Sequence, residues 1–303
     1  MSRFFAHLVL MRPANIITAI ADILLGFAAS GAGALLLRNN ELVTSHSPGR
    51  ILGWLIVATV GLYGGGVVFN DVFDAELDRV ERPERPIPSG AATRGSAALL
   101  GTLLLLGGIG SAFQVSRLSG GVAVTIALLA LVYDAVGKHQ PVLGPLNMGA
   151  CRGGNLLLGL SAVPTAVGEL WYLALLPVVY IAAITAISRG EVHGGDKRLL
   201  LGSLGLYGLV VGSVALLLGR SPLNGWYALP FLALFCTLIF PPLLRAIASL
   251  NPLDVRRAVK AGVMALILLD ATVAAGFAGW GWGLAVVALF PISRGLAKVF
   301  AVT

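Results

Sequence analysis

Charged residues are scarce in this sequence. Only 12% of the 303 residues are Asp, Glu, Lys or Arg, whereas 57% are hydrophobic, and the mean hydropathy is +0.90. A water-soluble domain cannot bury that much apolar surface in its core. The composition therefore excludes a soluble globular protein and predicts an integral membrane protein surrounded by membrane lipid.

Cysteine is also scarce, and a basic soluble domain is missing. Cys151 and Cys236 are the only cysteines in the sequence, and both fall inside apolar runs. They indicate neither a disulfide framework nor a thiolate metal site. Binding of nucleic acid would require a basic face on a soluble domain, so the net charge of +7 does not predict a nucleic-acid partner. Residues 1–303 are predicted to form a single integral-membrane domain.

Long apolar runs recur along the whole chain. A helix needs about 20 residues to cross a hydrocarbon layer of about 30 Å. The runs are continuous rather than alternating, which favours helices over β-strands. The ten predicted spans are 13–37, 51–69, 97–115, 120–136, 144–163, 170–187, 199–218, 226–243, 261–278 and 282–300. Glycines and Pro291 interrupt the last two runs, so nine spans remain an alternative. The predicted fold is an all-α bundle of nine to ten transmembrane helices.

The positive charges predict the orientation of these spans. Short cytoplasmic loops carry an excess of Lys and Arg. If the N-terminus lies inside, sixteen Lys and Arg residues fall in the cytoplasm, four fall outside and Arg152 lies within a span. We therefore expect a location in a bacterial inner membrane, with the loops after spans 2, 4, 6 and 8 in the cytoplasm.

Acidic residues gather on that same side of the membrane. The loops after spans 2, 4 and 6 hold nine of the 14 Asp and Glu residues. Six of the nine lie in the segment NDVFDAELDRVERPERPIPSG, residues 70–90. Carboxylates that served only solubility would be spread over both faces, so the cluster indicates a functional site.

The spacing within this segment suits a divalent cation. Asp71, Asp74 and Asp78 follow one another at i, i+3 and i+7, and Asn70 precedes them, so a continuing helix would place their oxygens on one face. Three unpaired carboxylates on that face would repel one another. Mg²⁺ would remove this conflict, because it takes oxygen ligands and is usually held by one or two carboxylates together with substrate phosphates.

Nearby cations, and the lack of a Walker-type glycine loop, indicate what the metal would hold. Arg82 and Arg85 lie where guanidinium groups could bind phosphate oxygens. Without a nucleotide loop, the phosphate is expected to belong to a lipid-like substrate whose tail lies in the bundle. Tyr133 and Lys138, at the end of span 4, lie at the same membrane level. Lys138 could equally bind a phosphate or act as an inside-positive anchor.

Polar residues inside the spans are further candidates, because they are costly in a membrane. Arg152 and Asn155 lie about one turn apart in span 5, and Asn15 lies in span 1. These three are predicted to be substrate-binding residues of a pocket. Asp22 and Asp270 lie nearer the membrane interior, where they would hydrogen-bond neighbouring helices or stay protonated.

Three stretches of the sequence resemble a known family. The segment at residues 70–90 is similar to the first aspartate-rich motif of the UbiA superfamily of intramembrane prenyltransferases, and its polar residues fit the pattern N-D-x-x-D-x-x-x-D. The stretches RPAN, at residues 12–15, and YDAVGK, at residues 133–138, extend the resemblance over most of the chain. The subgroup that it resembles most is that of the UbiA-like EboC proteins.

This resemblance implies a fold and an activity. It implies a bundle of about nine helices around a central cavity that opens sideways to lipid. In such a bundle, aspartate-bound Mg²⁺ grips the diphosphate of an isoprenyl diphosphate, the allylic C–O bond ionises, and a lipophilic acceptor, often an aromatic ring, captures the carbocation. The implied catalytic and metal-binding residues are Asp71, Asp74, Asp78 and Asp196.

The second motif of the family is altered in this chain. The segment SRGEVHGGDKR keeps a Gly195–Asp196 pair but has Arg189 and Val192 where further aspartates would align. The resemblance implies that Asp196 is the fourth metal ligand. Glu191 would replace one of the missing aspartates if the alignment shifted by one position. Substrate-binding roles in this segment are assigned to Glu191, Lys197 and Arg198, and His193 is a candidate partner of a metal ligand.

The altered motif keeps two functions open. One is an Mg²⁺-dependent prenyltransferase, and the other is a non-catalytic isoprenoid-binding or carrier protein. A transporter is suggested by the helix count and by Asp22 and Asp270, but the polar groups gather at one face, whereas transporters place their site near the midplane. A CDP-alcohol transferase is disfavoured because its D-G-x-x-A-R run is missing.

Overall fold

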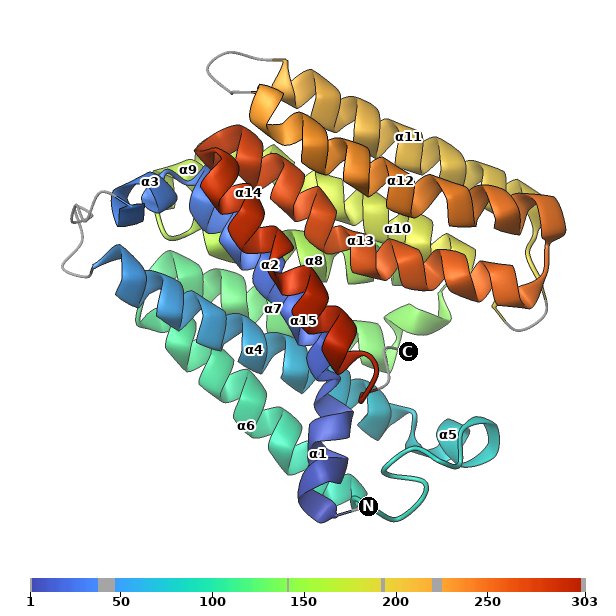
Figure 1. The fold of residues 1–303 in the computed structure, drawn as a ribbon. Coiled ribbons are helices and arrows are strands. Elements are labelled where there is room, and N and C mark those ends of the chain that lie inside the picture. The colour runs from blue at the N-terminus through green and yellow to red at the C-terminus, as the bar shows by residue number, and fades with distance from the viewer. Residues whose placement is uncertain (1, 38–46, 141, 192–193, 220–224, 301–303) are drawn as a thin grey trace.

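The structure is a computed structural model that describes residues 2–37, 47–140, 142–191, 194–219 and 225–300. Within these residues the regular structure is entirely helical, as the sequence predicts (Figure 1). In chain order the helices are α1 (Arg3–Met11), α2 (Pro13–Ala29), α3 (Ala32–Leu37), α4 (Pro48–Phe73), α5 (Ala75–Glu81), α6 (Arg94–Phe113), α7 (Arg117–Ala135), α8 (Leu143–Leu160), α9 (Pro164–Leu170), α10 (Leu175–Ser188), α11 (Lys197–Leu218), α12 (Gly225–Ser249), α13 (Pro252–Ala278), α14 (Trp280–Val287) and α15 (Leu289–Leu296). Short 3-10 turns occur at Gly137–His139 and Trp171–Ala174.

The apolar helices correspond closely to the predicted spans. Within the described residues, seven helical segments are long and apolar enough to cross a membrane: α4, α6, α7, the segment from α9 to α10, α11, α12 and α13. An eighth is the pair α1 and α2, which is bent by 41°. The two remaining predicted spans correspond to α8, which carries Arg152 and Asn155, and to α14 and α15, which form a shorter apolar stretch.

Helix α2 lies in the middle of the bundle, where it packs against α4, α8, α13 and α15 (Figure 1). Its crossing with α8 is unusually close because both helices have glycine there. A Cβ added to Gly26 would lie 2.4 Å from the Leu156 carbonyl oxygen, and one added to Gly159 would lie 2.6 Å from that of Ile23. Only glycine permits this approach of the two backbones. The crossing therefore fixes α2 against α8, and with them the polar side chains that both helices carry.

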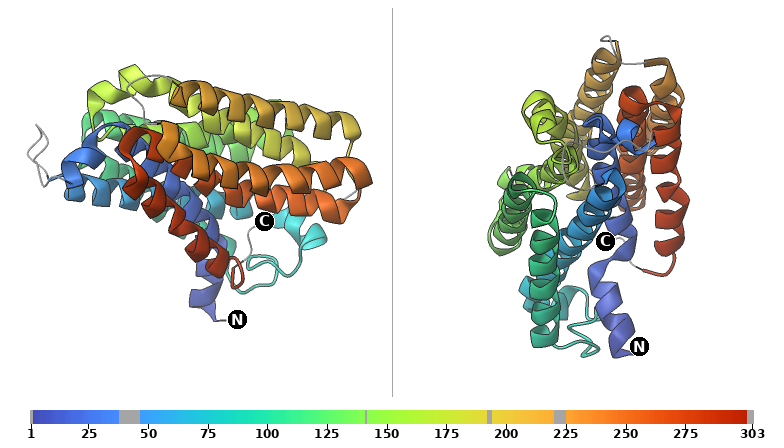
Figure 2. Two further views of the ribbon diagram at one scale, coloured as in Figure 1. Left: turned by 45° about the horizontal axis from the view of Figure 1, so that its top comes forward. Right: turned by 90° about the vertical axis from the view of Figure 1, so that its left-hand side faces the viewer.

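One end of the bundle carries the aspartate-rich segment. Helices α1 and α5 lie at this same end of the bundle (Figures 1 and 2). Helix α1 packs against α4 and α6, so the start of the chain is held beside the end of α4. The segments 12–15 and 70–90, which are far apart in the sequence, are thereby brought together.

Candidate functional site

The aspartate-rich segment continues α4 almost without interruption. Asn70 and Asp71 lie in the last turn of α4, Asp74 joins α4 to α5, and Asp78 lies in α5. The Asp74 N–H donates to the Asn70 carbonyl oxygen at 3.0 Å, and the Asp78 N–H donates to that of Asp74 at 2.8 Å. The chain thus keeps helical hydrogen bonds across the joint, as the spacing predicts. The side chains of Asp71 and Asp78 are buried.

Asp71 and Asp78 share one arginine. Arg85 Nη1 lies 2.7 Å from Asp78 Oδ2 and 3.3 Å from Asp71 Oδ1. Arg12 Nη2 also donates to Asp71 Oδ1, at 2.7 Å. Buried carboxylates are costly unless they are paired with opposite charge. The arginines therefore supply, in this structure, the neutralising charge for which the sequence suggested a metal ion.

The third aspartate of the motif is paired from another part of the chain. Lys138, in the 3-10 turn after α7, donates to Asp74 Oδ1 through its Nζ. The three carboxylates of the motif are thus matched by three cations, Arg12, Arg85 and Lys138. The repulsion between unpaired carboxylates that the sequence suggested is thus relieved in the fold by cations distant in the sequence.

The backbone of Arg12 has a conformation that is uncommon outside glycine. Its φ of 48° and ψ of 66° lie in the left-handed region, which costs about 1–3 kcal/mol for most residues. Arg12 forms the bend between α1 and α2, and Pro13 after it starts α2. The bend directs the Arg12 side chain to Asp71, so a strained backbone position supplies one of the cations of the motif.

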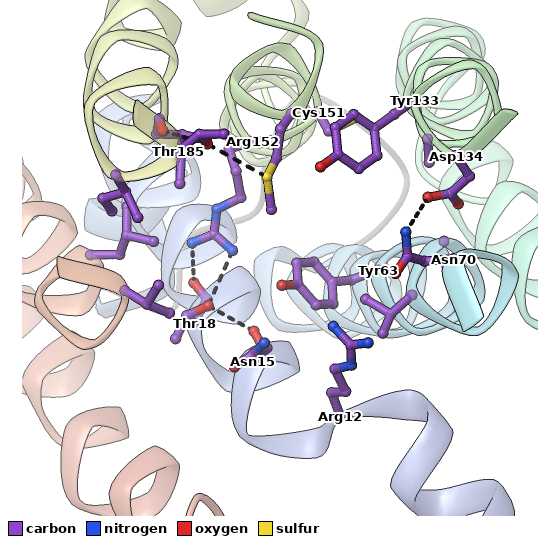
Figure 3. Close-up of a pocket in the computed structure, with 18 of the residues that line it drawn as sticks. Arg12, Asn15, Thr18, Tyr63, Asn70, Tyr133, Asp134, Cys151, Arg152 and Thr185 are labelled. Atoms are coloured by element: carbon purple, nitrogen blue, oxygen red, sulfur yellow. Dashed lines mark hydrogen bonds between the residues drawn. The ribbon is translucent and has the colours of Figure 1, made fainter. Parts of the chain in front are cut away.

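A cavity of about 420 Å³ opens beside these ion pairs (Figure 3). We define its motif end as the part lined by Arg12, Asn70, Arg82 and Arg85. The predicted site residues that line the cavity are Asn15, Asn70, Arg82, Arg85, Tyr133, Arg152, Asn155 and Glu191. Asp71 and Asp78 do not themselves line the cavity, but they form ion pairs with Arg12 and Arg85, which do.

Several lining residues are not among those predicted from the sequence. They include Arg12, Thr18, Tyr63, Asp134 and Cys151. Arg12 opens the stretch RPAN, and Tyr63 lies two helical turns before Asn70 on α4, so helical spacing could have identified both. Asp134 resembles an ordinary charge at the end of a span, and its position in the cavity depends on how α7 packs.

A buried polar cluster borders the cavity, and three of its members, Thr18, Arg152 and Asn155, line it. Its members are Thr18, Asp22, Thr59, Arg152, Asn155 and Asp270. The Arg152 guanidinium donates to the Thr18 side-chain and carbonyl oxygens at 3.2 and 3.0 Å (Figure 3). Its Nη2 donates to Asp22 Oδ1 at 3.2 Å, and its Nε lies 3.1 Å from Asp22 Oδ2. Arg152 lies in α8, and its side chain is held by hydrogen bonds to residues of α2.

The same cluster includes α4 and α13. Asn155 Nδ2 donates to the Ala19 carbonyl oxygen at 2.8 Å and to Asp22 Oδ2 at 3.0 Å, and Thr59 Oγ1 donates to Asn155 Oδ1 at 2.7 Å. Asp270, on α13, is buried beside Asp22. Asp22 is therefore engaged with a neighbouring helix, as one of the two sequence-based alternatives predicts.

The altered second motif contributes one carboxylate to the cavity. Glu191 lines the cavity, and burial raises the pKa of its carboxyl, an effect that the nearby Arg256 and Arg82 partly offset. Arg256 Nε also donates to the Glu191 carbonyl oxygen at 3.0 Å. His193, which the sequence also suggested, lies outside the described residues.

Asp196 has a different position from the one that the family motif suggests. It precedes α11 as its N-cap, and its Oδ1 accepts the Arg198 backbone N–H at 2.8 Å. Asp196, Lys197 and Arg198 are exposed, and none of the three lines the cavity. The structure therefore does not bring them together with Asp71 and Asp78.

Comparison with known proteins identifies the family. Residues 24–250, most of the chain, match the model of the UbiA prenyltransferase family. The chain belongs to the UbiA prenyltransferase family. Among UbiA relatives, it is 28% identical over 239 residues to the digeranylgeranylglyceryl phosphate synthase of Methanoculleus marisnigri, covering 75% of this chain and 80% of that one. The match to the synthase of the same name from Methanothermobacter thermautotrophicus is 26% over 251 residues, covering 80% and 81%.

Solved structures share the UbiA fold. A UbiA homologue from Aeropyrum pernix K1 superposes with a TM-score of 0.64 at 20% identity, covering 83% of this chain and 96% of that one. A UbiA homologue from Archaeoglobus fulgidus, bound to GPP and Mg²⁺, gives a TM-score of 0.58 at 16% identity, covering 93% and 99%. The predicted all-α UbiA-like fold is confirmed. The protein is thus a UbiA-family prenyltransferase and an integral, multi-pass membrane protein.

Proposed function

We propose that this UbiA-family protein catalyses the Mg²⁺-dependent transfer of an isoprenyl group from an isoprenyl diphosphate to a lipophilic acceptor. The observation that carries the proposal is the junction of a charged end and an apolar chamber. Asp71 and Asp78 meet Arg12 and Arg85 at the motif end, whereas nine aliphatic side chains line other parts of the cavity. An isoprenyl diphosphate likewise has a charged head and an apolar hydrocarbon tail.

The motif end fits Mg²⁺ held jointly with a phosphate. Asp71 Oδ1 and Asp78 Oδ2 both contact Arg85 Nη1, so two hard oxygen donors converge. In the part of the chain that the structure describes, no three His, Cys, Asp or Glu side chains are grouped to hold a metal alone. One or two carboxylates with substrate phosphates are usual for Mg²⁺, so Asp71 and Asp78, with Asp74 beside them, would hold the ion. When bound, it would stabilise the negative charge of the leaving diphosphate.

The cations paired with the motif aspartates are suited to bind the diphosphate itself. Arg12, Arg85 and Lys138 each contact a motif carboxylate. Arginine binds phosphate oxygens through strong, often bidentate hydrogen bonds. We infer that these cations exchange carboxylate partners for phosphate oxygens when the donor enters, and that Arg82, which lines the cavity without a motif carboxylate in the described structure, contributes further positive charge.

The interior of the cavity is suited to the hydrocarbon tail and to a short-lived carbocation. The allylic C–O bond breaks with its electron pair leaving on the diphosphate. Aliphatic side chains would exclude water from that cation, and the aromatic rings of Tyr63 and Tyr133, which can stabilise a cation, also line the cavity. The aliphatic lining includes Leu62, Ile126, Ile181, Ile184, Val263 and Leu266.

The relatives suggest which substrates to test first. Two of them are named digeranylgeranylglyceryl phosphate synthase, and solved homologues hold GPP or DMAPP with Mg²⁺. A panel of donors from dimethylallyl to geranylgeranyl diphosphate, with glyceryl phosphate lipids and phenols as acceptors, covers these chemistries. From the distribution of Lys and Arg we further propose that residues 1–303 act as one unit in a bacterial inner membrane, with the motif end facing the cytoplasm.

The test is direct assay of the purified protein in lipid nanodiscs. Labelled donors are incubated with each acceptor, with Mg²⁺ or with excess EDTA, and diphosphate and labelled lipid are quantified. We expect both products with Mg²⁺ and neither with EDTA. Mg²⁺-dependent donor binding without diphosphate release across the panel would instead support the second candidate, an isoprenoid-binding or carrier protein, which the exposed position of Asp196 favours.

Asp196 offers a prediction that separates helix capping from metal binding. Asp196→Ala should lower the free energy of unfolding by about 1 kcal/mol, as expected for a lost N-cap. Asp196→Asn should keep the cap and leave binding of geranyl thiolodiphosphate with Mg²⁺ within about twofold of wild type, because Asn caps as well as Asp. Unfolding in detergent and titration calorimetry measure the two effects. Loss of donor binding in Asp196→Asn would place the carboxylate at the metal instead.

A further inference from the structure

Asp134 is a cavity-lining carboxylate that the donor site described above does not use. It lies in the last turn of α7 and is only 3% exposed. Asn70 Nδ2 donates to its Oδ1 at 2.9 Å (Figure 3). Its Oδ2 receives no hydrogen bond from the described residues. One oxygen of Asp134 is thus anchored, and the other is available to a molecule in the cavity.

Asp134 differs in its partner from the three aspartates of the motif and from Asp22. Asp22, Asp71 and Asp78 each pair with an arginine, and Asp74 pairs with Lys138. Protonation of any of these four would break an ion pair. Among the described residues, the bonded partner of Asp134 is a neutral amide. It can therefore take up a proton without the loss of an ion pair.

The position of Asp134 places it beside the reacting end of a donor. Asn70, which it contacts, directly precedes Asp71, and Lys138, four residues further along, contacts Asp74. The other charged or titratable groups near Asp134 are Arg12, Tyr133 and Cys151. A diphosphate held at the motif end would have its allylic carbon next to this end, and Asp134 lines the cavity while hydrogen-bonded to Asn70 of the same end.

Prenyl transfer to a hydroxyl or to an aromatic carbon leaves one proton to be removed. The allylic C–O bond breaks with its electron pair on the diphosphate, and an electron pair of the acceptor forms the new bond to the allylic carbon. The acceptor then carries a surplus proton. We propose, on the basis of the proposed transferase function, that Asp134 is the catalytic base that accepts this proton through Oδ2. The proton passes to water when the product leaves.

Asp134→Asn tests this role without removing the anchor, because the amide oxygen of Asn can still accept from Asn70. We expect transfer to the acceptor to fall by about 10²- to 10⁴-fold, the range for loss of general base catalysis. Binding of geranyl thiolodiphosphate with Mg²⁺ should stay within twofold, and a larger share of the consumed donor should appear as prenyl alcohol. Asp134→Glu should recover part of the transfer. Asp254→Asn, at a carboxylate that does not line the cavity, is the matched control.

Two results would overturn the assignment while leaving the proposed function intact. One is wild-type transfer by Asp134→Asn. The other is loss of Mg²⁺-dependent donor binding by a folded Asp134→Asn protein, which would make Asp134 a positioning residue for Asn70. A wild-type protein that binds donors but never releases diphosphate would overturn the proposed function, and this assignment with it.

Discussion

Asp71→Asn is expected to lower Mg²⁺-dependent diphosphate release by at least about 100-fold, the scale for losing one preorganised electrostatic contact to a transition state. The Asp71 carboxylate is the point where Arg12 and Arg85 meet, and it is one of the two converging oxygens proposed for Mg²⁺. Asn preserves the shape of the side chain but removes its charge. Initial rates of diphosphate release, measured over a range of Mg²⁺ concentrations, give the size of the effect.

The control for this change is Glu76→Gln in the same segment. Glu76 is largely exposed and pairs only with Arg79 within the described structure, so an equal loss of charge there should leave the rate near that of wild type. Surface pairs of this kind contribute about 0–1 kcal/mol. If Asp71→Asn and Glu76→Gln gave equal rates, the motif end would have no special role in the reaction.

Asp22→Ala should be among the most destabilising substitutions in the protein. It would leave the Arg152 guanidinium buried without its carboxylate, and removal of one partner from a buried ion pair costs about 3–5 kcal/mol. Asn155 would lose a hydrogen-bond partner as well. The free energy of unfolding, measured by denaturant titration in mixed micelles, should fall by this amount.

The double variant Asp22→Ala/Arg152→Met distinguishes a lost ion pair from a simple cavity. Replacement of a whole buried pair by apolar side chains is often neutral or stabilising. We therefore expect the double variant to be more stable than Asp22→Ala alone, although it has one more substitution. A double variant that is less stable than the single one would show that packing around Asp22, rather than its charge, dominates.

Local patterns were sufficient to predict most of the helices and the continuation of α4 into the motif. Continuous apolar runs define helices whatever their neighbours are, and the spacing of Asp71, Asp74 and Asp78 is a property of one helix. Within the described residues, seven or eight segments are long and apolar enough to span, against nine to ten predicted, because α8 carries polar side chains and α14 and α15 are short. Arg152 and Asn155 of α8 bond to α2 rather than facing lipid.

The ion pairs of the motif could not be predicted from local patterns. Arg12 reaches Asp71 across 59 positions, and Lys138 reaches Asp74 across 64. These contacts depend on the bend at Arg12 and on the packing of α7 beside α4. Asp196 illustrates the opposite problem, since an aspartate before an apolar run is also a helix-capping signal. Asp196 fits both the family motif and a helix-capping signal, and in the structure it caps α11.

The polar face of α2 makes the length of this helix as important as its composition. Polar residues recur at intervals of three or four along α2 and its N-cap: Arg12, Asn15, Thr18 and Asp22. The same helix therefore positions Arg12 beside Asp71 and Asp22 beside Arg152. One residue inserted between them would rotate all that follows by about 100°. The two charged ends would then fall out of phase, and no single replacement elsewhere could realign them. Natural variation in α2 should therefore exchange side chains but preserve the residue count.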